Sequence, residues 1–240
     1  EVLELSGGWQ PITDDAIYDS SDTDSLIIKM ADLSMNGFKY RVIITDSLGN
    51  FKRSNAQATL TVNPRPVAVA TPQQDTICNG ETTYVSFSSD VIGTTYAVEI
   101  LSSGNIIGAK EYTEYEGYST IEDTLINPTL YADSVVYVIT PYGPSATHCE
   151  GTRDTVVIWV EPTVEITAVN DTICNGDFTN IVVSSENITT NGIYYTWTAT
   201  ASDPDVSGFT NNAIGQDISV PLEEQLINIG LDSAIVHYTI

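Results

Sequence analysis

Positive charge is scarce in this 240-residue sequence. Eight lysines and arginines face 32 aspartates and glutamates, which gives a formal net charge of −24. After residue 65 only Lys110 and Arg153 remain, against 23 acidic residues. Nucleic acid binding needs a basic surface to neutralise phosphates, and anionic membranes attract basic residues in the same way. The composition therefore argues against nucleic acid and against anionic membranes as partners, and the acidity is typical of a solubilising surface.

Signatures of catalysis and of membrane insertion are also missing. The only histidines are His148 and His237, and no Gly-x-Ser-x-Gly motif or metal-spaced histidine cluster is present. No run of 18 apolar residues exists, so this segment is not expected to span a bilayer. We therefore predict a non-enzymatic protein without a catalytic residue, a cofactor or an assigned metal site.

An internal repeat organises the chain. The six residues Asp75–Gly80 (Asp-Thr-Ile-Cys-Asn-Gly) return unchanged at 171–176, an offset of 96 residues. Two looser echoes, 60–64 with 158–162 and 133–139 with 232–238, have offsets of 98 and 99. A period near 100 residues is the size of one β-sandwich domain. Because threonine, valine and tyrosine are plentiful, we predict an all-β chain of tandem β-sandwiches in an extended array.

The repeat and the prolines set the expected domains. Residues 1–64 are expected to form a partial Ig-like domain that lacks its first strands, followed by the prolines of 64–66. Residues 65–162 are expected to form one complete repeat, ending at Pro162. Residues 163–240 are expected to form a second copy, truncated before its last hairpin.

Several strands follow from alternation of apolar and polar residues. In the first domain we expect a strand at 25–29, a helical turn within 30–36, a core strand at 40–45, and a strand at 57–62 with Ala58, Leu60 and Val62 inward. The complete repeat is expected to use 83–88, 95–101, 134–140 and 155–160, with a loop or edge hairpin at 111–118. In the last copy Tyr195, Trp197 and Ala199 are expected to face inward. We interpret Trp197 as a core residue rather than as a platform that stacks on sugars.

Cysteines are odd in number. Cys78 and Cys149 lie in the same copy, whereas Cys174 is the repeat equivalent of Cys78. We predict a Cys78–Cys149 disulfide and hence an oxidising, extracellular compartment, with two buried free thiols as the alternative. The partner of Cys174 stays open, because the equivalent of Cys149 would lie at about residue 248.

Aspartate is followed by serine or threonine more often than composition predicts. This holds for ten of the 18 aspartates, whereas chance predicts about four, and in eight cases an apolar residue comes next. A turn aspartate followed by a β-branched residue and a core residue is one way to begin a strand. That explanation covers part of the excess, but not the preference for Ser and Thr over Val and Ile.

The two copies resemble PKD-like repeats of giant cell-surface adhesins of gliding Bacteroidota. The resemblance rests on Asp75–Gly80, 138–141 and 159–162 in the first copy, and on 170–176, 195–202 and 236–240 in the second. The first domain resembles Ig-like domains of bacterial surface proteins through 36–42, with Tyr40 as a corner tyrosine, and through Gly49 and 60–62.

These resemblances imply export by type IX secretion and surface-anchoring machinery, display on the outer cell surface, and adhesion to a surface polysaccharide or substratum during gliding. They also imply that the Asp-Ser/Thr-apolar motif is an acceptor for O-glycosylation. The eight candidate acceptors are Ser25, Ser47, Thr76, Thr124, Ser134, Thr155, Thr172 and Ser233.

Ca²⁺ is the one cofactor that the arrangement of acidic residues suggests. Asp19, Asp22 and Asp24 lie close together, but an EF-hand counted from Asp19 would need a glycine at position 24 and a glutamate at position 30, which is Met30. A looser site there or at 203–205 remains open, and a solvated turn is the preferred interpretation.

The leading hypothesis is a segment of a long secreted adhesin or filament that acts as a non-catalytic stalk or adhesive array. One alternative is a spacer or carbohydrate-binding region of a large secreted glycan-degrading enzyme. Another is a structural subunit of a surface layer or fibre.

Overall fold

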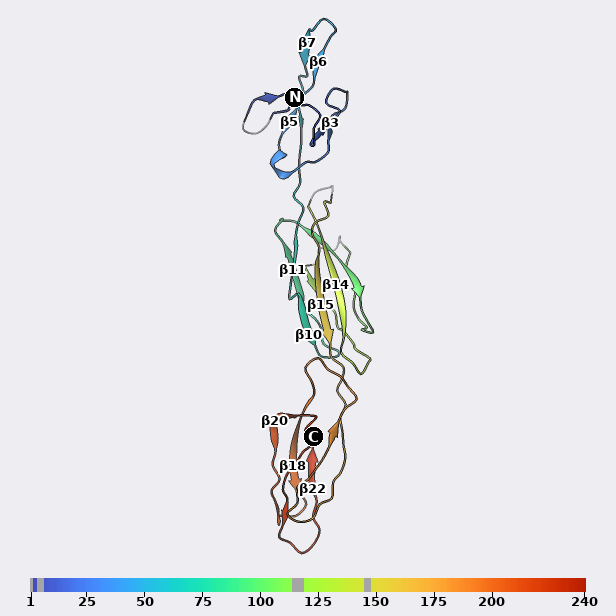
Figure 1. Ribbon diagram of the computed structural model, residues 1–240, viewed down its shortest axis with the longest axis vertical. Helices are drawn as coiled ribbons and strands as arrows, with labels where there is room; N and C mark the ends of the chain where they lie inside the picture. The colour runs from blue at the N-terminus through green and yellow to red at the C-terminus, as the bar shows by residue number, and fades with distance from the viewer. Residues whose placement is uncertain (1, 4–6, 114–118, 145–147) are drawn as a thin grey trace.

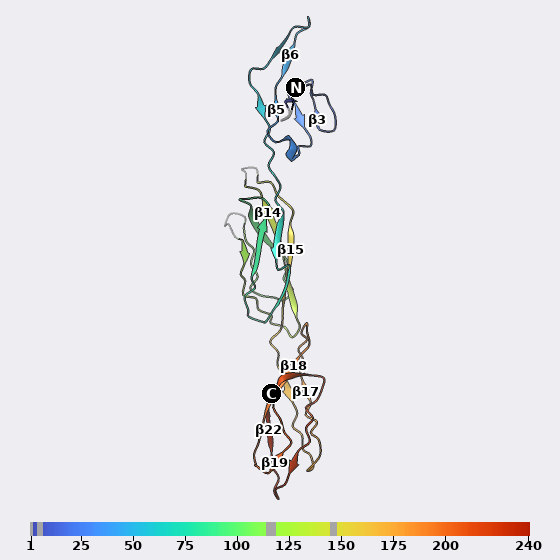
Figure 2. The same cartoon turned by 90° about the vertical axis from the view of Figure 1, so that its left-hand side faces the viewer.

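The structure is a computed structural model that describes residues 2–3, 7–113, 119–144 and 148–240. Three modules follow one another along the long axis of the molecule, and the view turned by 90° shows the same order (Figures 1 and 2). The first module contains β1 to β8, the second β9 to β15 and the third β16 to β22. Within the described ranges, no sheet contains strands of two modules. The predicted all-β class with tandem sandwiches is confirmed.

The first module has short strands and little core. Its sheets have the orders β2-β1-β5-β8, β3-β4 and β6-β7. Met35 is the one hydrophobic side chain of this module that is buried, as far as its described residues go. The elements are β1 (Val2–Leu3), β2 (Trp9–Gln10), β3 (Tyr18–Asp19), β4 (Ile27–Ile28), η1 (Leu33–Met35), β5 (Lys39–Tyr40), β6 (Ile43–Thr45), β7 (Phe51–Arg53) and β8 (Ala58–Thr59).

Some expectations for the first module are confirmed and others are wrong. The expected helical turn is η1, which the Asp32 side chain caps. Residues 46–50 form the turn that joins β6 to β7. The core strand at 40–45 is wrong: the chain leaves the sheet after Tyr40, and Val42 and Ile44 are 50% and 69% exposed on the projecting hairpin (Figure 1). The inward-facing strand at 57–62 is wrong in part, because β8 stops at Thr59 and Ala58 is exposed.

The second module is a complete sandwich. One sheet has the order β10-β15-β14-β12 and the other β13-β11-β9. β15 pairs parallel with β10 and antiparallel with β14, so it lies between these two strands in the sheet. Its strands are β9 (Ala68–Thr71), β10 (Gln74–Ile77), β11 (Val85–Ser89), β12 (Thr95–Ser102), β13 (Thr120–Ile121), β14 (Asp133–Tyr142) and β15 (Asp154–Val160). The four strands expected here are confirmed. The predicted loop or hairpin at 111–118 lies mostly outside the described residues.

Between the two sheets lies a core of fifteen buried side chains, which include Val135, Tyr137, Val156, Ile158 and Val160. These five residues alternate along β14 and β15 as the pleat requires, and each is 0% exposed. β15 therefore contributes three of the most deeply buried side chains of the module.

The third module repeats this plan with fewer paired strands. β18 pairs with β20 and β22, β16 with β17, and β19 with β21. Tyr195, Trp197 and Ala199 on β18 are 3%, 7% and 8% exposed, and the Trp197 ring nitrogen donates to the Thr210 carbonyl at 3.1 Å, which confirms Trp197 as a core residue. The strands are β16 (Thr167–Ala168), β17 (Val183–Ser184), β18 (Tyr194–Ala201), β19 (Val206–Ser207), β20 (Asn212–Asp217), β21 (Ile227–Asn228) and β22 (Val236–Thr239).

Candidate functional site: the joint between the second and third modules

The repeated motif forms a tight turn at one end of each copy. The Glu81 amide donates to the Cys78 carbonyl, and the Asp177 amide donates to the Cys174 carbonyl, both at 3.1 Å. Gly80 and Gly176 have φ values of 83° and 89°, a left-handed conformation that favours glycine. The Cys-Asn-Gly part of the repeat is therefore explained by backbone geometry in both copies.

The motif asparagine ties this turn to a neighbouring loop. The side-chain oxygen of Asn79 accepts the Asn127 amide at 2.8 Å, and Asn175 accepts the Asn228 amide at the same distance. In the second module the Asn79 side chain also donates to the Thr163 hydroxyl at 2.8 Å, which lies in the linker to the third module. The motif of the second module therefore contacts the linker to the third module.

Polar bonds then hold the third module against the second. The carboxylate of Glu161, directly after β15, accepts the Thr190 amide at 3.1 Å and also its hydroxyl. The Ile188 amide donates to the Leu130 carbonyl, and the Ala132 amide donates to the Ile188 carbonyl, each at 2.9 Å. The loop of the third module therefore adds a short stretch of parallel β pairing to the end of the second.

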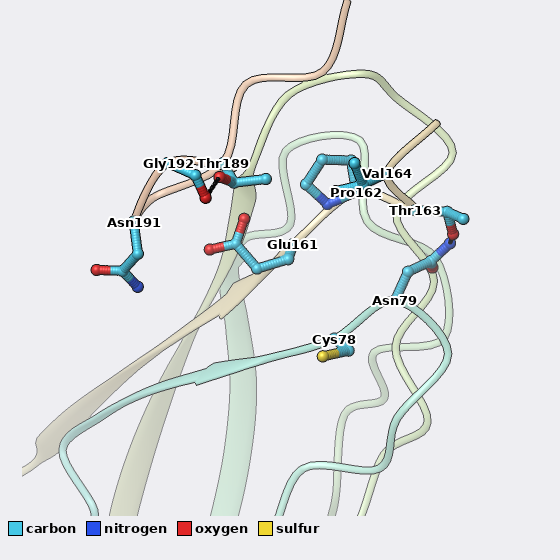
Figure 3. A pocket seen from close by; sticks show the side chains of 9 residues that line it. All are labelled: Cys78, Asn79, Glu161, Pro162, Thr163, Val164, Thr189, Asn191 and Gly192. Carbon is cyan, nitrogen blue, oxygen red and sulfur yellow. Dashed lines mark hydrogen bonds between the residues drawn. The ribbon is translucent and has the colours of Figure 1, made fainter. Parts of the chain in front are cut away.

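A hollow of about 520 Å³ marks the joint. Figure 3 shows Glu161 near its centre, opposite the loop that carries Thr189 and Asn191. Glu161 is the one charged side chain among its lining residues, which are Cys78, Asn79, Glu161, Pro162, Thr163, Val164, Thr189, Asn191 and Gly192. Hydrogen bonds from Asn79 to Thr163 and from Thr190 to Glu161 therefore link the second module to the third at this hollow.

Sequence reasoning recognised the motif but missed the joint. Glu161 and Thr190 join the two modules, and no sequence pattern predicted this pair. A signal exists for Glu161, because it stands before Pro162 at the place where Asn63 stands before Pro64. Thr190 has no such signal, since its partner lies 29 residues away and only the tertiary structure pairs them.

The predicted Cys78–Cys149 disulfide is wrong. Cys78 follows β10 beside Val160, whereas Glu150 pairs with Tyr142 at the opposite end of the module. About ten strand positions separate the two ends, which at about 3.3 Å per residue is roughly 30 Å. A disulfide requires Cα atoms within about 7 Å. Cys78 is also exposed rather than buried, and Cys149 is half-buried, so the alternative of two buried thiols does not hold either.

The other sequence candidates do not assemble into a reaction centre. His148 lies in the second module and His237 on β22 of the third, both exposed. Across the described ranges, no group of three or more His, Cys, Asp or Glu residues has a geometry that would hold a metal ion. Asp19 lies 3.6 Å from the Lys29 ammonium, and Asp203 accepts the Asp205 amide. Within those ranges, no helix has the length and apolarity needed to cross a membrane.

Seven of the eight candidate glycosylation residues are exposed, and Ser134 is half-buried. The aspartates before four of them each accept the amide of the next residue at 2.7 to 2.8 Å; these are Asp75, Asp133, Asp154 and Asp171. The second oxygen of Asp133, Asp154 and Asp171 accepts an amide from a distant segment. Folding thus explains these aspartates, while Thr76, Thr155 and Thr172 beside them are exposed.

Comparison with known proteins finds that one part of the chain is similar to a domain family. Residues 75–164 match the model of the PKD-like domain. This match begins at the repeated motif and ends just past the Glu161-Pro162 linker. Domains of this kind are commonly non-catalytic parts of extracellular proteins.

No curated protein matches the chain. Among solved structures, a crystal structure of the FN1–FN3 domains of chicken CNTN1 is similar, with 11% sequence identity and a TM-score of 0.27. The match covers 83% of this chain, which spans 64% of the length of that structure.

Proposed function

We propose that this chain is a non-catalytic segment of a long extracellular adhesin or filament, in which β-sandwich modules act as a stalk that holds adhesive surfaces away from the cell. The observation that carries the proposal is the joint at Glu161. A stalk must transmit force and direction from one module to the next. The bond that Glu161 accepts from Thr190, the bond that Asn79 donates to Thr163, and the β pairing at Ile188 supply that coupling.

The strong negative charge suits the same role. Residues 66–240 carry a net charge of −21, spread over two slender modules. Like charges repel over about 8 Å at physiological ionic strength, so neighbouring stalks resist lateral association. Type IX secretion, attachment to the outer surface, and a surface polysaccharide or substratum as partner belong to this proposal through the resemblance to adhesin repeats.

O-glycosylation is a further part of the proposal. Exposure favours Ser25, Ser47, Thr76, Thr124, Thr155, Thr172 and Ser233 over the half-buried Ser134. Peptide mass spectrometry of native protein would locate the modified residues. Hexose-type additions on the exposed set with Ser134 bare are expected, and peptide masses without additions would exclude glycosylation.

The test of the stalk is made on intact cells of the producing organism. Antibody fragments raised against residues 66–240 are expected to label unbroken cells and to reduce their attachment to a polysaccharide-coated surface. The matched control is a fragment against a cytoplasmic protein, which should label only broken cells. Labelling that requires cell lysis, or attachment unchanged at saturating antibody, contradicts the proposal. A catalytic domain encoded in the same chain, with glycan hydrolysis blocked by the antibody, would favour a spacer in an enzyme instead.

A further inference from the structure

The dipeptide Asn-Gly occurs four times in the chain, at 36–37, 79–80, 175–176 and 191–192. Asparagine deamidates most readily before glycine, because glycine has no side chain to shield its backbone nitrogen and its backbone turns easily. In this reaction the glycine nitrogen attacks Cγ of the asparagine side chain. A fold that holds both groups in place therefore suppresses the reaction.

Three of the four pairs are held by bonds to distant segments. In each of them the glycine amide donates to a backbone carbonyl at 2.9 Å, and the asparagine side-chain oxygen accepts a backbone amide at 2.8 to 3.0 Å. The carbonyls bound by Gly37, Gly80 and Gly176 belong to Leu60, Leu125 and Leu226, and the amides bound by Asn36, Asn79 and Asn175 belong to Val62, Asn127 and Asn228. Both reacting groups of these pairs are therefore fixed by the fold.

The fourth pair lies in the loop at the joint and is held only locally. Asn191 and Gly192 are both exposed. Among the described residues, the side-chain and carbonyl bonds of this pair stay within 189–192: the Asn191 side chain donates to the Thr190 hydroxyl at 3.1 Å, and the Gly192 carbonyl accepts the Thr189 hydroxyl at 2.8 Å. A Cβ built on Gly192 would meet no atom within 4 Å. The Asn191 carboxamide can therefore turn toward Gly192 without breaking a bond to another segment.

The position of this loop gives deamidation a consequence. Thr190 donates its amide and its hydroxyl to Glu161, and Glu161 and Asn191 line the same hollow (Figure 3). The Asn191 side chain supplies a donor to the Thr190 oxygen, which leaves the hydroxyl proton for Glu161. A carboxylate at position 191 has no donor and accepts that proton itself. It also adds a negative charge to the hollow that contains Glu161, and like charges repel.

We propose that Asn191 is a site of spontaneous deamidation, and that the reaction loosens the joint between the second and third modules. The Gly192 nitrogen loses its proton to solvent base and attacks Cγ of Asn191, and Nδ2 leaves as ammonia, so that a succinimide ring forms. Water opens the ring at one of its two carbonyls and leaves aspartate or isoaspartate at position 191. Isoaspartate also lengthens the backbone by one carbon directly after Thr190. This inference rests on the joint and not on the proposed function.

Ageing of the purified 240-residue chain at neutral pH tests the chemistry. Peptide mass spectrometry with a glutamate-specific protease should show a gain of about 1 Da at Asn191, divided between two products. The other three asparagines should react roughly tenfold more slowly, since their hydrogen bonds must open first. The chain unfolded in urea is the matched control, and there all four sites should react at similar rates. Equal rates at the four sites of the folded chain, or an unreactive Asn191, would overturn the assignment.

A pair of variants tests the effect on the joint. Asn191→Asp has the charge of the product, whereas Asn191→Gln keeps a donor for Thr190 and lacks the geometry for the five-membered ring. Residual dipolar couplings should report a wider spread of orientations between the second and third modules in Asn191→Asp and in the aged chain, and the natural spread in Asn191→Gln. Equal couplings in the two variants would overturn the proposed effect on the joint.

Discussion

The second and third modules carry the same motif but differ in how much of a sandwich the described residues include. In the second, β15 lies between β10 and β14, and fifteen buried side chains form one core cluster. In the third, the described residues have no strand at that place, a hollow of about 810 Å³ lies there, and four buried side chains form the core cluster. β15 turns three of the fifteen buried side chains into the space between the sheets, so the core of the second module depends on its last strand.

Three features are common to both modules. Both modules keep the motif turn, the asparagine pair and a buried carboxylate that accepts a tyrosine hydroxyl. Asp123 accepts Tyr137 at 2.7 Å and Tyr112 at 2.6 Å, and Glu224 accepts Tyr238 at 2.6 Å. In both cases burial and the carboxylate raise the pKa of the tyrosine, so the hydroxyl stays a donor. Local turn geometry and side-chain hydrogen bonds are therefore less sensitive to β15 than the apolar core is.

The largest difference is expected at a matched pair of leucines. Leu125 is 0% exposed, while its equivalent Leu226 is half-buried and lines the hollow. Leu125→Ala should destabilise its module by about 3 kcal/mol, and Leu226→Ala its own by about 1 kcal/mol, because only the first creates a closed cavity. Hydrogen exchange resolved by peptide would measure each module separately. Equal losses would mean that β15 does not govern burial.

The carboxylates should differ less than the leucines. Asp123→Ala removes the acceptor of the Tyr137 hydroxyl, which is 0% exposed, at a cost of about 3 kcal/mol. Glu224→Ala frees Tyr238 beside the hollow, where water can replace the carboxylate, and about 1 kcal/mol is expected. Urea unfolding with module-specific NMR signals would show the order. A larger loss for Glu224→Ala would contradict it.

The motif glycines should show no difference. Gly80 and Gly176 have the same positive φ, and a Cβ at either position meets no atom within 4 Å. Alanine should therefore cost about 1 kcal/mol in each module, from backbone strain alone. A clear excess in the second module, measured by hydrogen exchange, would mean that its turn also stabilises the joint.

Thr190→Val tests the joint itself. The substitution removes the hydroxyl that donates to Glu161 but keeps the shape of the side chain. Module stability should change by less than about 0.5 kcal/mol, since the contact is exposed, while residual dipolar couplings should report a wider spread of orientations between the second and third modules. Thr189→Val is the control, because the Thr189 hydroxyl donates within its own loop. Unchanged couplings in Thr190→Val would mean that the hydroxyl bond does not orient the modules, since the Thr190 amide still donates to Glu161.

Acid should affect the second module through Asp133. Hydrogen bonds from the Asn105 and Ser134 amides hold the pKa of this carboxyl below its ordinary 3.8. A lowered folded-state pKa means that the stabilisation is complete above pH 3.8 and is lost as the pH falls through the folded value. Asp133→Asn should therefore be less stable than the natural chain at pH 6 and should approach it below pH 3. A constant gap from pH 6 to pH 2.5 in melting temperature would contradict this assignment.

Much of the fold was predicted from the alternation of apolar and polar residues. Alternation located β11, β12, β14 and β15, and it placed Tyr195 and Trp197 inward. The same reasoning failed at 40–45, because alternation does not reveal whether a second layer covers the strand. The location of Cys78 and Cys149 in one copy suggested a pair, but the ends of a sandwich are far apart, and only strand direction shows which end holds each cysteine.

The sequence by itself determined the class, the period and the turns, because these depend on neighbouring residues: β-branched runs extend the chain, and a glycine permits positive φ. The tertiary structure alone decided the bond of Glu161 to Thr190, the distance between Cys78 and Cys149, and the hollow beside β22. Each of these depends on which strands lie next to one another, and that pairing is set by how two sheets bury their apolar faces together rather than by any residue's immediate neighbours.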